Sequence, residues 1–439
     1  MTKLSTDRRR LLLGIGAAAG GTLAAGMCPF HAASAAESGP AHAADAPEPN
    51  PSAAERQPFY GVHQAGIVTP RPANGMVAAF NVVLRKPADL ENLFRRLTER
   101  IVFLTQGGEW PDLDPRLPPP DSGILGPKLA PDDLTITVGL GSSFFADRPW
   151  LEKLAPAKLQ RMTEFPNDAL DPAICHGDLS LQICANTQDT VIHALRDIVK
   201  NTSQYLVLRW MQDGNVPAVI ERNPDGTRQS ARNFLGFRDG SANPDSNDAT
   251  AMDEIVWIGA DSPNAEPDWA VGGTYQAVRI IRNFVERWDR TPLREQEEII
   301  GRKKASGAPL DGTGEYDEPD YASDADGART PLDAHIRLAN PRTNASQENL
   351  LLRRPFNYSN GVTRAGQIDQ GLLFITFQAD LEKGFIAVQN RLNGEPLEEY
   401  IKPVGGGYFF VLPGVRAPGG YLGQGLVEAV AAAPEMTPL

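Results

Sequence analysis

LSLQICANTQDTVIHALRDIVKNTSQYLVLRW, residues 179–210, predicts a strand, a helix and a second strand in direct succession. The first strand covers Leu179–Cys184, the helix lies near Thr187–Lys200, and the second strand covers Tyr205–Trp210. Upstream of this segment we expect a strand over 76–83, a helix from 87 to about 106, and a strand over 134–140. The predicted order of elements is therefore β-α-β-β-α-β, which is typical of a ferredoxin-like split unit.

The same kind of order returns in the second half of the chain. The expected elements there are a strand over 275–281, a helical stretch from 284 to about 302, a strand over 372–378, a helix over 381–392 and a strand over 408–412. A region rich in Gly, Asp and Pro, residues 303–365, reads as a long loop, and loops of that length are commonly functional. We predict an α+β protein with two ferredoxin-like halves, residues 59–215 and 216–439.

The N-terminus has the pattern of an export signal. Arg8, Arg9 and Arg10 stand directly before a mildly apolar run rich in Gly and Ala, and Ala33-Ser34-Ala35 supplies a cleavage site. Residues 1–35 are predicted to be a twin-arginine signal peptide, and residues 36–58 a flexible leader. We therefore expect a periplasmic or extracellular protein. The alternative is an uncleaved signal anchor. Export of folded protein also favours a cofactor that is inserted before transport.

Composition excludes some classes of function. The formal net charge is −13, which argues against nucleic acid as a partner because phosphate binding needs clustered Lys and Arg. The chain has three cysteines and no CxxC or HExxH motif, so a structural zinc or iron–sulfur site is not expected. Cys175 and Cys184 would remain after cleavage, and the sequence leaves open whether they pair.

Two segments contain residues that could carry chemistry. His335 is one of six histidines and lies inside the long loop of the second half, whereas the other five are interpreted as surface or structural residues. Asp239 stands between apolar residues and glycines in NFLGFRDGS, residues 233–241, where glycine permits tight turns and close approach of the backbone to a ligand. Either segment alone also fits an ordinary loop.

Together the two segments resemble the dye-decolorising peroxidases. The resemblance rests on Gly236-x-x-Asp239-Gly240 and on HIRLANPR at 335–342. It continues in LLRRPFNY at 351–358, GLLF at 371–374, LEKGF at 381–385 and GGGYFF at 405–410. It covers residues 61–412 and is greatest to the exported, iron-uptake-associated branch, whose members are also called deferrochelatases. The resemblance implies a duplicated, dimeric α/β-barrel-like haem fold.

The resemblance also implies a proximal side for one haem b per chain. His335 would be the axial ligand of the iron. Such a ligand is usually oriented by an acceptor on its other ring nitrogen, for which Glu395 is the candidate and Glu398 the fallback.

On the distal side, Asp239 would move a proton between the two oxygens of hydrogen peroxide, and Arg353 would stabilise developing negative charge. The alternative for Arg353 is an ordinary surface arginine. Some relatives carry an asparagine where this chain has Pro355. Further contacts with the cofactor are expected from Gly236, Phe237, Arg238, Gly240, Leu372 and Phe374.

The implied activity is reduction of hydrogen peroxide with oxidation of dyes, phenols or ferrous iron, and release of iron from haem is a second implied reaction. The alternative is a non-catalytic periplasmic haem carrier of an iron-uptake system, which would not need a distal acid and cation. A related haem fold acting on chlorite is disfavoured by the Gly-x-x-Asp-Gly segment. Family resemblance suggests homodimers or larger assemblies, and iron-uptake proteins as partners.

Overall fold

The computed structural model describes residues 51–433, apart from 111–113, 220 and 263. The predicted signal peptide, 1–35, and leader residues 36–50 lie outside the described residues. The rest of the predicted leader begins with a short 3₁₀-helix, η1 (Pro51–Ala54). This segment is tied to the folded chain, because the backbone amides of Asp132 and Asp133 donate hydrogen bonds to the carbonyls of Ala53 and Glu55. None of the described helices has the length and apolar character that a bilayer span requires.

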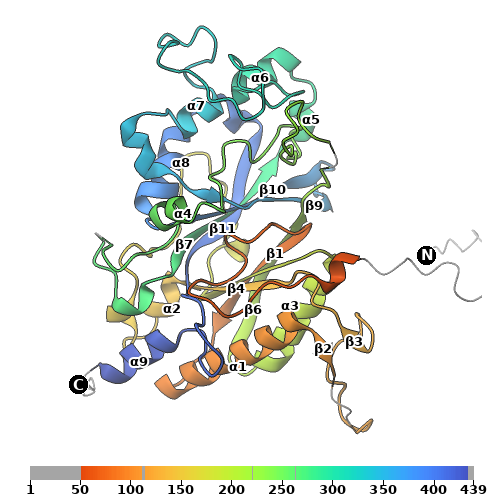
Figure 1. Cartoon of the computed structure of the whole chain (residues 1–439), viewed down its shortest axis with the longest axis vertical. Coiled ribbons are helices and arrows are strands. Elements are labelled where there is room, and N and C mark those ends of the chain that lie inside the picture. The colour runs from red at the N-terminus through yellow and green to blue at the C-terminus, as the bar shows by residue number, and fades with distance from the viewer. Residues whose placement is uncertain (1–50, 111–113, 220, 263, 434–439) are drawn as a thin grey trace, which may run out of the picture. The chain divides into compact units, whose positions relative to one another are not determined.

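The N-terminal half is an antiparallel sheet covered by two helices (Figure 1). Its elements are β1 (Asn74–Val82), α1 (Pro87–Gln106), β4 (Thr135–Gly141), β5 (Leu179–Ala185), α3 (Gln188–Thr202) and β6 (Leu206–Asn215). The strand order is β4-β5-β1-β6, and α1 and α3 pack side by side on one face of the sheet. Leucines 90, 93 and 97, one or two turns apart on α1, are fully buried there. The predicted split unit is confirmed.

The C-terminal half repeats this topology. Its strands are β7 (Thr274–Asn283), β9 (Phe356–Val362), β10 (Ile368–Gln378) and β11 (Ile401–Val411), in the order β11-β7-β10-β9. If the four strands of each half are numbered in chain order, both halves read 4-1-3-2 across the sheet. These orders are β6-β1-β5-β4 in the N-terminal half and β11-β7-β10-β9 in the C-terminal half. The duplicated α+β fold predicted from element order is therefore confirmed.

Two local predictions for this half are wrong. Region 303–365 is not one loop, because it contains α7 (His335–Ala339), β8 (Leu352–Arg353) and β9, where Phe356 and Tyr358 alternate into the core. The helix expected over 284–302 is two short helices, α5 (Val285–Trp288) and α6 (Leu293–Ile300), separated before Pro292. Proline cannot continue a helix, since it lacks the amide hydrogen and clashes with the preceding turn.

The two halves share one sheet. β11 pairs with β4, β6 meets β9 at Asn215 and Asn357, and β7 also pairs with β10, so the eight longer strands form a closed ring. An apolar cluster that includes Val77, Ile280 and Phe377 fills the space inside the ring. Cys184 belongs to this inner cluster and Cys175 to the cluster beneath the helices, and both are buried thiols that form no disulfide.

The remaining elements are short. They are β2 (Gly108–Glu109), β3 (Lys128–Leu129), α2 (Ser142–Ala146), η2 (Glu152–Leu154), η3 (Pro172–Ile174), α4 (Ala249–Ile255), η4 (Asp268–Ala270), η5 (Asn344–Asn349), the π-helix η6 (Glu382–Ile386), α8 (Ala387–Leu392), η7 (Pro396–Glu399) and α9 (Gln424–Ala432).

A buried ion pair fastens a loop of the N-terminal half to the central strand of the other half. Arg279 on β7 donates to Asp168, and each side chain is only 1% exposed. The guanidinium also lies over the ring of Phe165. Two charges this deep in a protein interior are stable only as a pair, because each has lost its water.

Asp168→Asn is expected to lower the free energy of unfolding by about 3–5 kcal/mol, because Arg279 then remains buried without a counter-charge. Urea denaturation followed by tryptophan fluorescence measures this loss. Glu298→Gln is the matched control, since it removes the exposed pair with Arg294 and should leave the denaturation midpoint unchanged. Equal midpoints for both variants and the wild type would contradict the account.

Candidate active site

His335 is the first residue of α7 and is held by a buried carboxylate. Its Nδ1 donates to Oε2 of Glu395 over 2.7 Å. Glu395 follows Gly394, which takes a positive φ of 82°, and immediately precedes η7. The side chain of Glu395 is 3% exposed, whereas that of His335 is 33% exposed. Glu398, the fallback candidate, instead accepts a hydrogen bond from the amide of Gly394.

The ionic partner controls the protonation of His335. Burial disfavours the charged imidazole, but the charge and hydrogen bond of Glu395 outweigh this effect and raise the pKa of His335. Nδ1 is engaged, and no described residue forms a hydrogen bond with Nε2. Nε2 is therefore the ring nitrogen left to bind a metal, once it has lost its proton.

Asp239 is positioned by a tight loop. Residues 232 and 238 form an antiparallel bridge, and the amide of Asp239 donates to the carbonyl of Ala231. The loop turns at Gly236, whose φ of 87° is a conformation that residues with a side chain rarely adopt. Oδ1 of Asn233 accepts from the amides of Leu235 and Phe237 and stabilises the turn. The glycine singled out in the sequence thus shapes the loop that carries the acid.

Arg353 meets Asp239 from the neighbouring sheet. It lies in β8, where it pairs with Thr376 of β10. Its Nη1 donates to Oδ1 of Asp239 over 2.6 Å, and the two side chains are 28% and 11% exposed. Asn243 fixes the backbone of Arg353 by bonding both its amide and its carbonyl. Arg353 is therefore not an ordinary surface arginine, and the structure brings it together with Asp239 as expected.

The two pairs are coupled electrostatically, and the cleft of the candidate site lies beside Asp239. The charges of Arg353 and Asp239 reach His335 and contribute to its pKa, after the effects of burial and Glu395. The lining of this cleft includes Arg71, Asn233 and Leu372. An acid with a fixed cation at one place and an imidazole held by a carboxylate at another can together move protons and bind a metal.

The other residues that were predicted to contact the cofactor fall into two groups. Leu372 and Phe374 are half-buried on the same face of β10, and Phe374 packs against Phe385. Phe237 is buried against Trp288 in a separate apolar cluster, and Nη1 of Arg238 donates to the carbonyl of Ser230. The side chain of Phe237 therefore serves the core. Ser230 also lies nearest to Gly240, whose φ is 146°.

Sequence reasoning missed Arg71, Asn233 and Asn243. Asn233 could have been found, because Asn followed three residues later by Gly is typical of a turn stabilised by the asparagine side chain. Arg71 gives no comparable signal. It donates to the carbonyl of Pro355, and burial lowers its pKa to about 10, although Asp239 acts in the opposite direction.

Known protein families account for most of the chain. Residues 64–215 match the model described as Dyp-type peroxidase, N-terminal, and residues 230–416 match Dyp-type peroxidase, C-terminal. The chain belongs to the Dyp-type peroxidase family. As a member of this family, it is a haem-dependent peroxidase.

Individual relatives agree with this assignment. Proteins named deferrochelatase from Escherichia coli O6:K15:H31 and Shigella sonnei are each 56% identical to this chain over 423 residues, which cover 96% of it and 97% of the relative. Among solved structures, the DyP-type peroxidase of Cellulomonas bogoriensis is 36% identical with a TM-score of 0.74, and covers 86% of this chain and 99% of its own. That of Streptomyces coelicolor is 33% identical with a TM-score of 0.76, and covers 86% and 98%.

The residues present fit a haem. The donor set contains an imidazole with Nε2 free and Nδ1 bonded to a carboxylate, which is the usual second partner of a metal-bound histidine. Leu372 and Phe374 offer apolar surface, and Asp239 and Arg353 supply an acid and a fixed cation. His335 would hold the iron, and the apolar pair would contact the ring.

Glu395→Gln is expected to weaken haem binding by about 10–100-fold, because the uncharged amide orients and polarises the His335 ring less strongly. Titration of the apo-protein with haem, followed by absorbance, measures the affinity. Glu398→Gln is the control and should bind haem like the wild type. If Glu395→Gln also binds like the wild type, Glu395 does not support the ligand.

Proposed function

We propose that this haem peroxidase uses His335 as the proximal iron ligand and Asp239 with Arg353 as its peroxide-activating pair. The observation that carries the proposal is the 2.6 Å ion pair between Arg353 and Asp239, beside which the chain offers an imidazole at His335 that Glu395 holds over 2.7 Å. When bound, haem supplies the redox-active iron that passes electrons from the reductant to peroxide. The expected reductants are dyes, phenols or ferrous iron.

Asp239 is suited to hold a proton for a short time. Its Oδ1 accepts from Arg353, while Oδ2 has only a long contact of 3.4 Å from Nδ2 of Asn233. Oδ2 is therefore the oxygen that would take a proton from one oxygen of hydrogen peroxide and return it to the other. The loop anchored at Ala231 keeps this oxygen beside the cleft.

Arg353 is suited to bind negative charge rather than to move protons. A guanidinium remains protonated in proteins and offers several donors in a fixed plane. Its backbone is held by Asn243 on both sides, so little reorganisation is needed when charge develops on the departing peroxide oxygen. The fixed position also prevents Asp239 from turning away from the cleft.

Release of iron from haem is the second proposed activity. It is supported by the relatives named deferrochelatase, which match nearly the whole length of the chain. Export by the twin-arginine route, with residence in the periplasm or outside the cell, is supported by Arg8–Arg10 and the cleavage pattern at 33–35. Iron-uptake proteins are the expected partners.

Asp239→Asn is expected to slow the reaction of the haem-loaded protein with hydrogen peroxide by about 10²–10⁴-fold, the usual contribution of a general acid–base group. Stopped-flow absorbance in the Soret band measures the rate. Asp245→Asn, a change at an exposed carboxylate of the same loop region, is the control. A wild-type rate in Asp239→Asn would refute its role. A wild-type protein that binds haem and ignores peroxide would instead favour the haem-carrier alternative.

Replacing Arg8, Arg9 and Arg10 with lysine is expected to retain the protein in the cytoplasm, because the twin-arginine pathway reads the arginine side chains. Cell fractionation followed by immunoblotting measures its location. Replacement of Lys3 with arginine is the control and should be exported normally. Export of the triple-lysine variant would contradict the assignment of the signal.

A further inference from the structure

The helix that carries His335 is too short to fix its own orientation. α7 has five residues, and Ala334 provides no side-chain cap at its N-terminus. Isolated helices of this length are unstable in water, because nucleation costs more than the few hydrogen bonds return. The direction of the His335 ring therefore depends on Glu395, which holds Nδ1, and on the side chains that tie α7 to its surroundings.

Arg391 of α8 ties down the C-terminal end. Its Nε donates to the carbonyl of Leu338 over 3.0 Å, and its Nη2 donates to the carbonyl of Ala339 over 2.9 Å. These bonds satisfy carbonyls that the helix itself leaves without partners. They hold the C-terminal end of α7, which is the end opposite His335.

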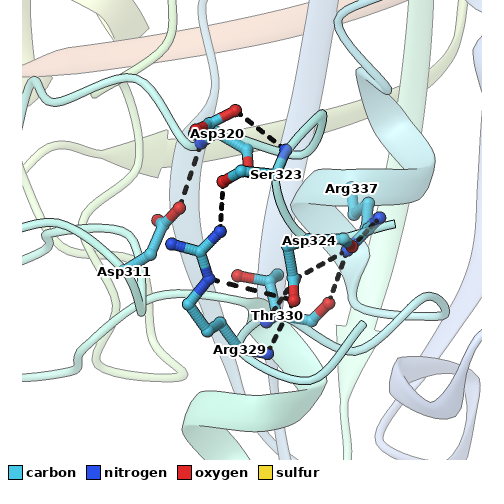
Figure 2. Close-up of polar contacts among 7 residues, drawn as sticks. All are labelled: Asp311, Asp320, Ser323, Asp324, Arg329, Thr330 and Arg337. Carbon is cyan, nitrogen blue, oxygen red and sulfur yellow. Dashed lines mark hydrogen bonds and ion pairs between the residues drawn. The ribbon is translucent and has the colours of Figure 1, made fainter. Parts of the chain in front are cut away.

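Arg337 provides a second attachment on the far side of the helix. It follows His335 by two residues, which is a rotation of about 200° at 3.6 residues per turn. Figure 2 shows its guanidinium directed at Asp324 and Thr330. Nη1 donates to Oδ2 of Asp324 over 3.0 Å and to the carbonyl of Thr330 over 2.7 Å, and Nη2 donates to the carbonyl of Asp324 over 2.7 Å.

Asp324 is itself firmly placed. Its side chain is 3% exposed, and its carboxylate accepts from the amides of Arg329 and Thr330, each over 2.9 Å. These amides, together with Arg337, hold the pKa of Asp324 below its ordinary value. The carboxylate therefore stays charged near neutral pH and gives Arg337 a fixed anionic partner within a closed turn.

We propose that Asp324 is a positioning residue for His335, acting through Arg337 to fix the rotation of α7 about its axis. The inference rests on the proposed role of His335 as iron ligand. Asp324 contacts neither His335 nor the space before it, so its effect passes through the helix. A change at Asp324 should alter the direction of the imidazole and leave the Asp239–Arg353 pair as it is.

Three variants separate positioning from simple loosening of the loop. Asp324→Asn removes the charge, and Arg337→Lys keeps the charge but loses the planar fork. Arg329→Gln is the matched control, because Arg329 approaches the same carboxylate at 3.9 Å from the exposed side and bonds Ser323 (Figure 2). In the structure, Arg329 has no bond to α7, so its loss tests the loop alone.

The first readout is hydrogen–deuterium exchange of the apo-protein, followed by mass spectrometry of peptides covering α7. Exchange there should be about tenfold faster in Asp324→Asn and Arg337→Lys, because a hydrogen bond to a charged group typically shifts a local equilibrium by at least that factor. Exchange outside α7 and the turn 324–330 should match the wild type in all variants, and exchange of α7 in Arg329→Gln should match it too. Unchanged exchange of α7, or an equal increase over the whole chain, would overturn the proposal.

The second readout is the iron–histidine stretching band of the haem-loaded ferrous protein, measured by resonance Raman spectroscopy. The band should shift or broaden in Asp324→Asn and Arg337→Lys and stay unchanged in Arg329→Gln. If Asp324→Asn does not fold, Arg337→Lys decides the matter alone. An unchanged band in the folded variants would overturn the proposal. A band that persists in His335→Ala would instead refute the assignment of His335 as iron ligand. The exchange measurement would still show whether Asp324 holds α7 in place, because it does not depend on haem.

Discussion

The pairing of β10 with β7 is the constraint on which the proposed distal side of the site depends. Eight consecutive residue pairs join the two strands, from Gly371 with Arg282 to Gln378 with Tyr275. A slip of one residue would turn every side chain of β10 to the opposite face. The inner face carries Leu373, Ile375 and Phe377, which are fully buried inside the ring of strands, so such a slip would be strongly unfavourable. The same register therefore fixes Leu372 and Phe374 on the other face.

The edge of β10 that faces away from β7 positions Arg353. Thr376 pairs with Arg353, and the remainder of that edge pairs with β9. The acid comes from a loop outside the sheet, and Asn243 joins this loop region to the backbone of Arg353. The proximal side is built differently, because a five-residue helix supplies His335 and a turn before η7 supplies Glu395. The candidate site thus combines residues of a rigid sheet with residues of several short segments that side-chain bonds hold in place.

Much of this arrangement could be predicted from sequence, because it depends on local patterns. The helix over 87–106 has its apolar residues at spacings of three and four, and it begins and ends as expected. The β9 strand could not be predicted, since only its first three residues, Phe356–Tyr358, are buried, and Ser359–Val362 are exposed. The division of helix 284–302 was signalled by Pro292 and was overlooked.

The candidate site divides in the same way. Asp239 and His335 stand in motifs that a family pattern identifies, and Glu395 was expected as the partner of His335. The ion pair between Asp239 and Arg353 was not predicted. Arg71 and Asp324 could not be predicted, because they reach the site region only through tertiary contacts with Pro355 and Arg337. Nothing in the residues next to Asp324 along the chain indicates that its partner lies on the helix of His335.

A crystal structure of the haem-loaded protein, with the iron located by anomalous scattering, tests the central claim most directly. The account predicts the iron within bonding distance of Nε2 of His335, with Asp239 and Arg353 on the opposite face of the ring. Iron bound by another side chain, or Asp239 on the same face as His335, would contradict it.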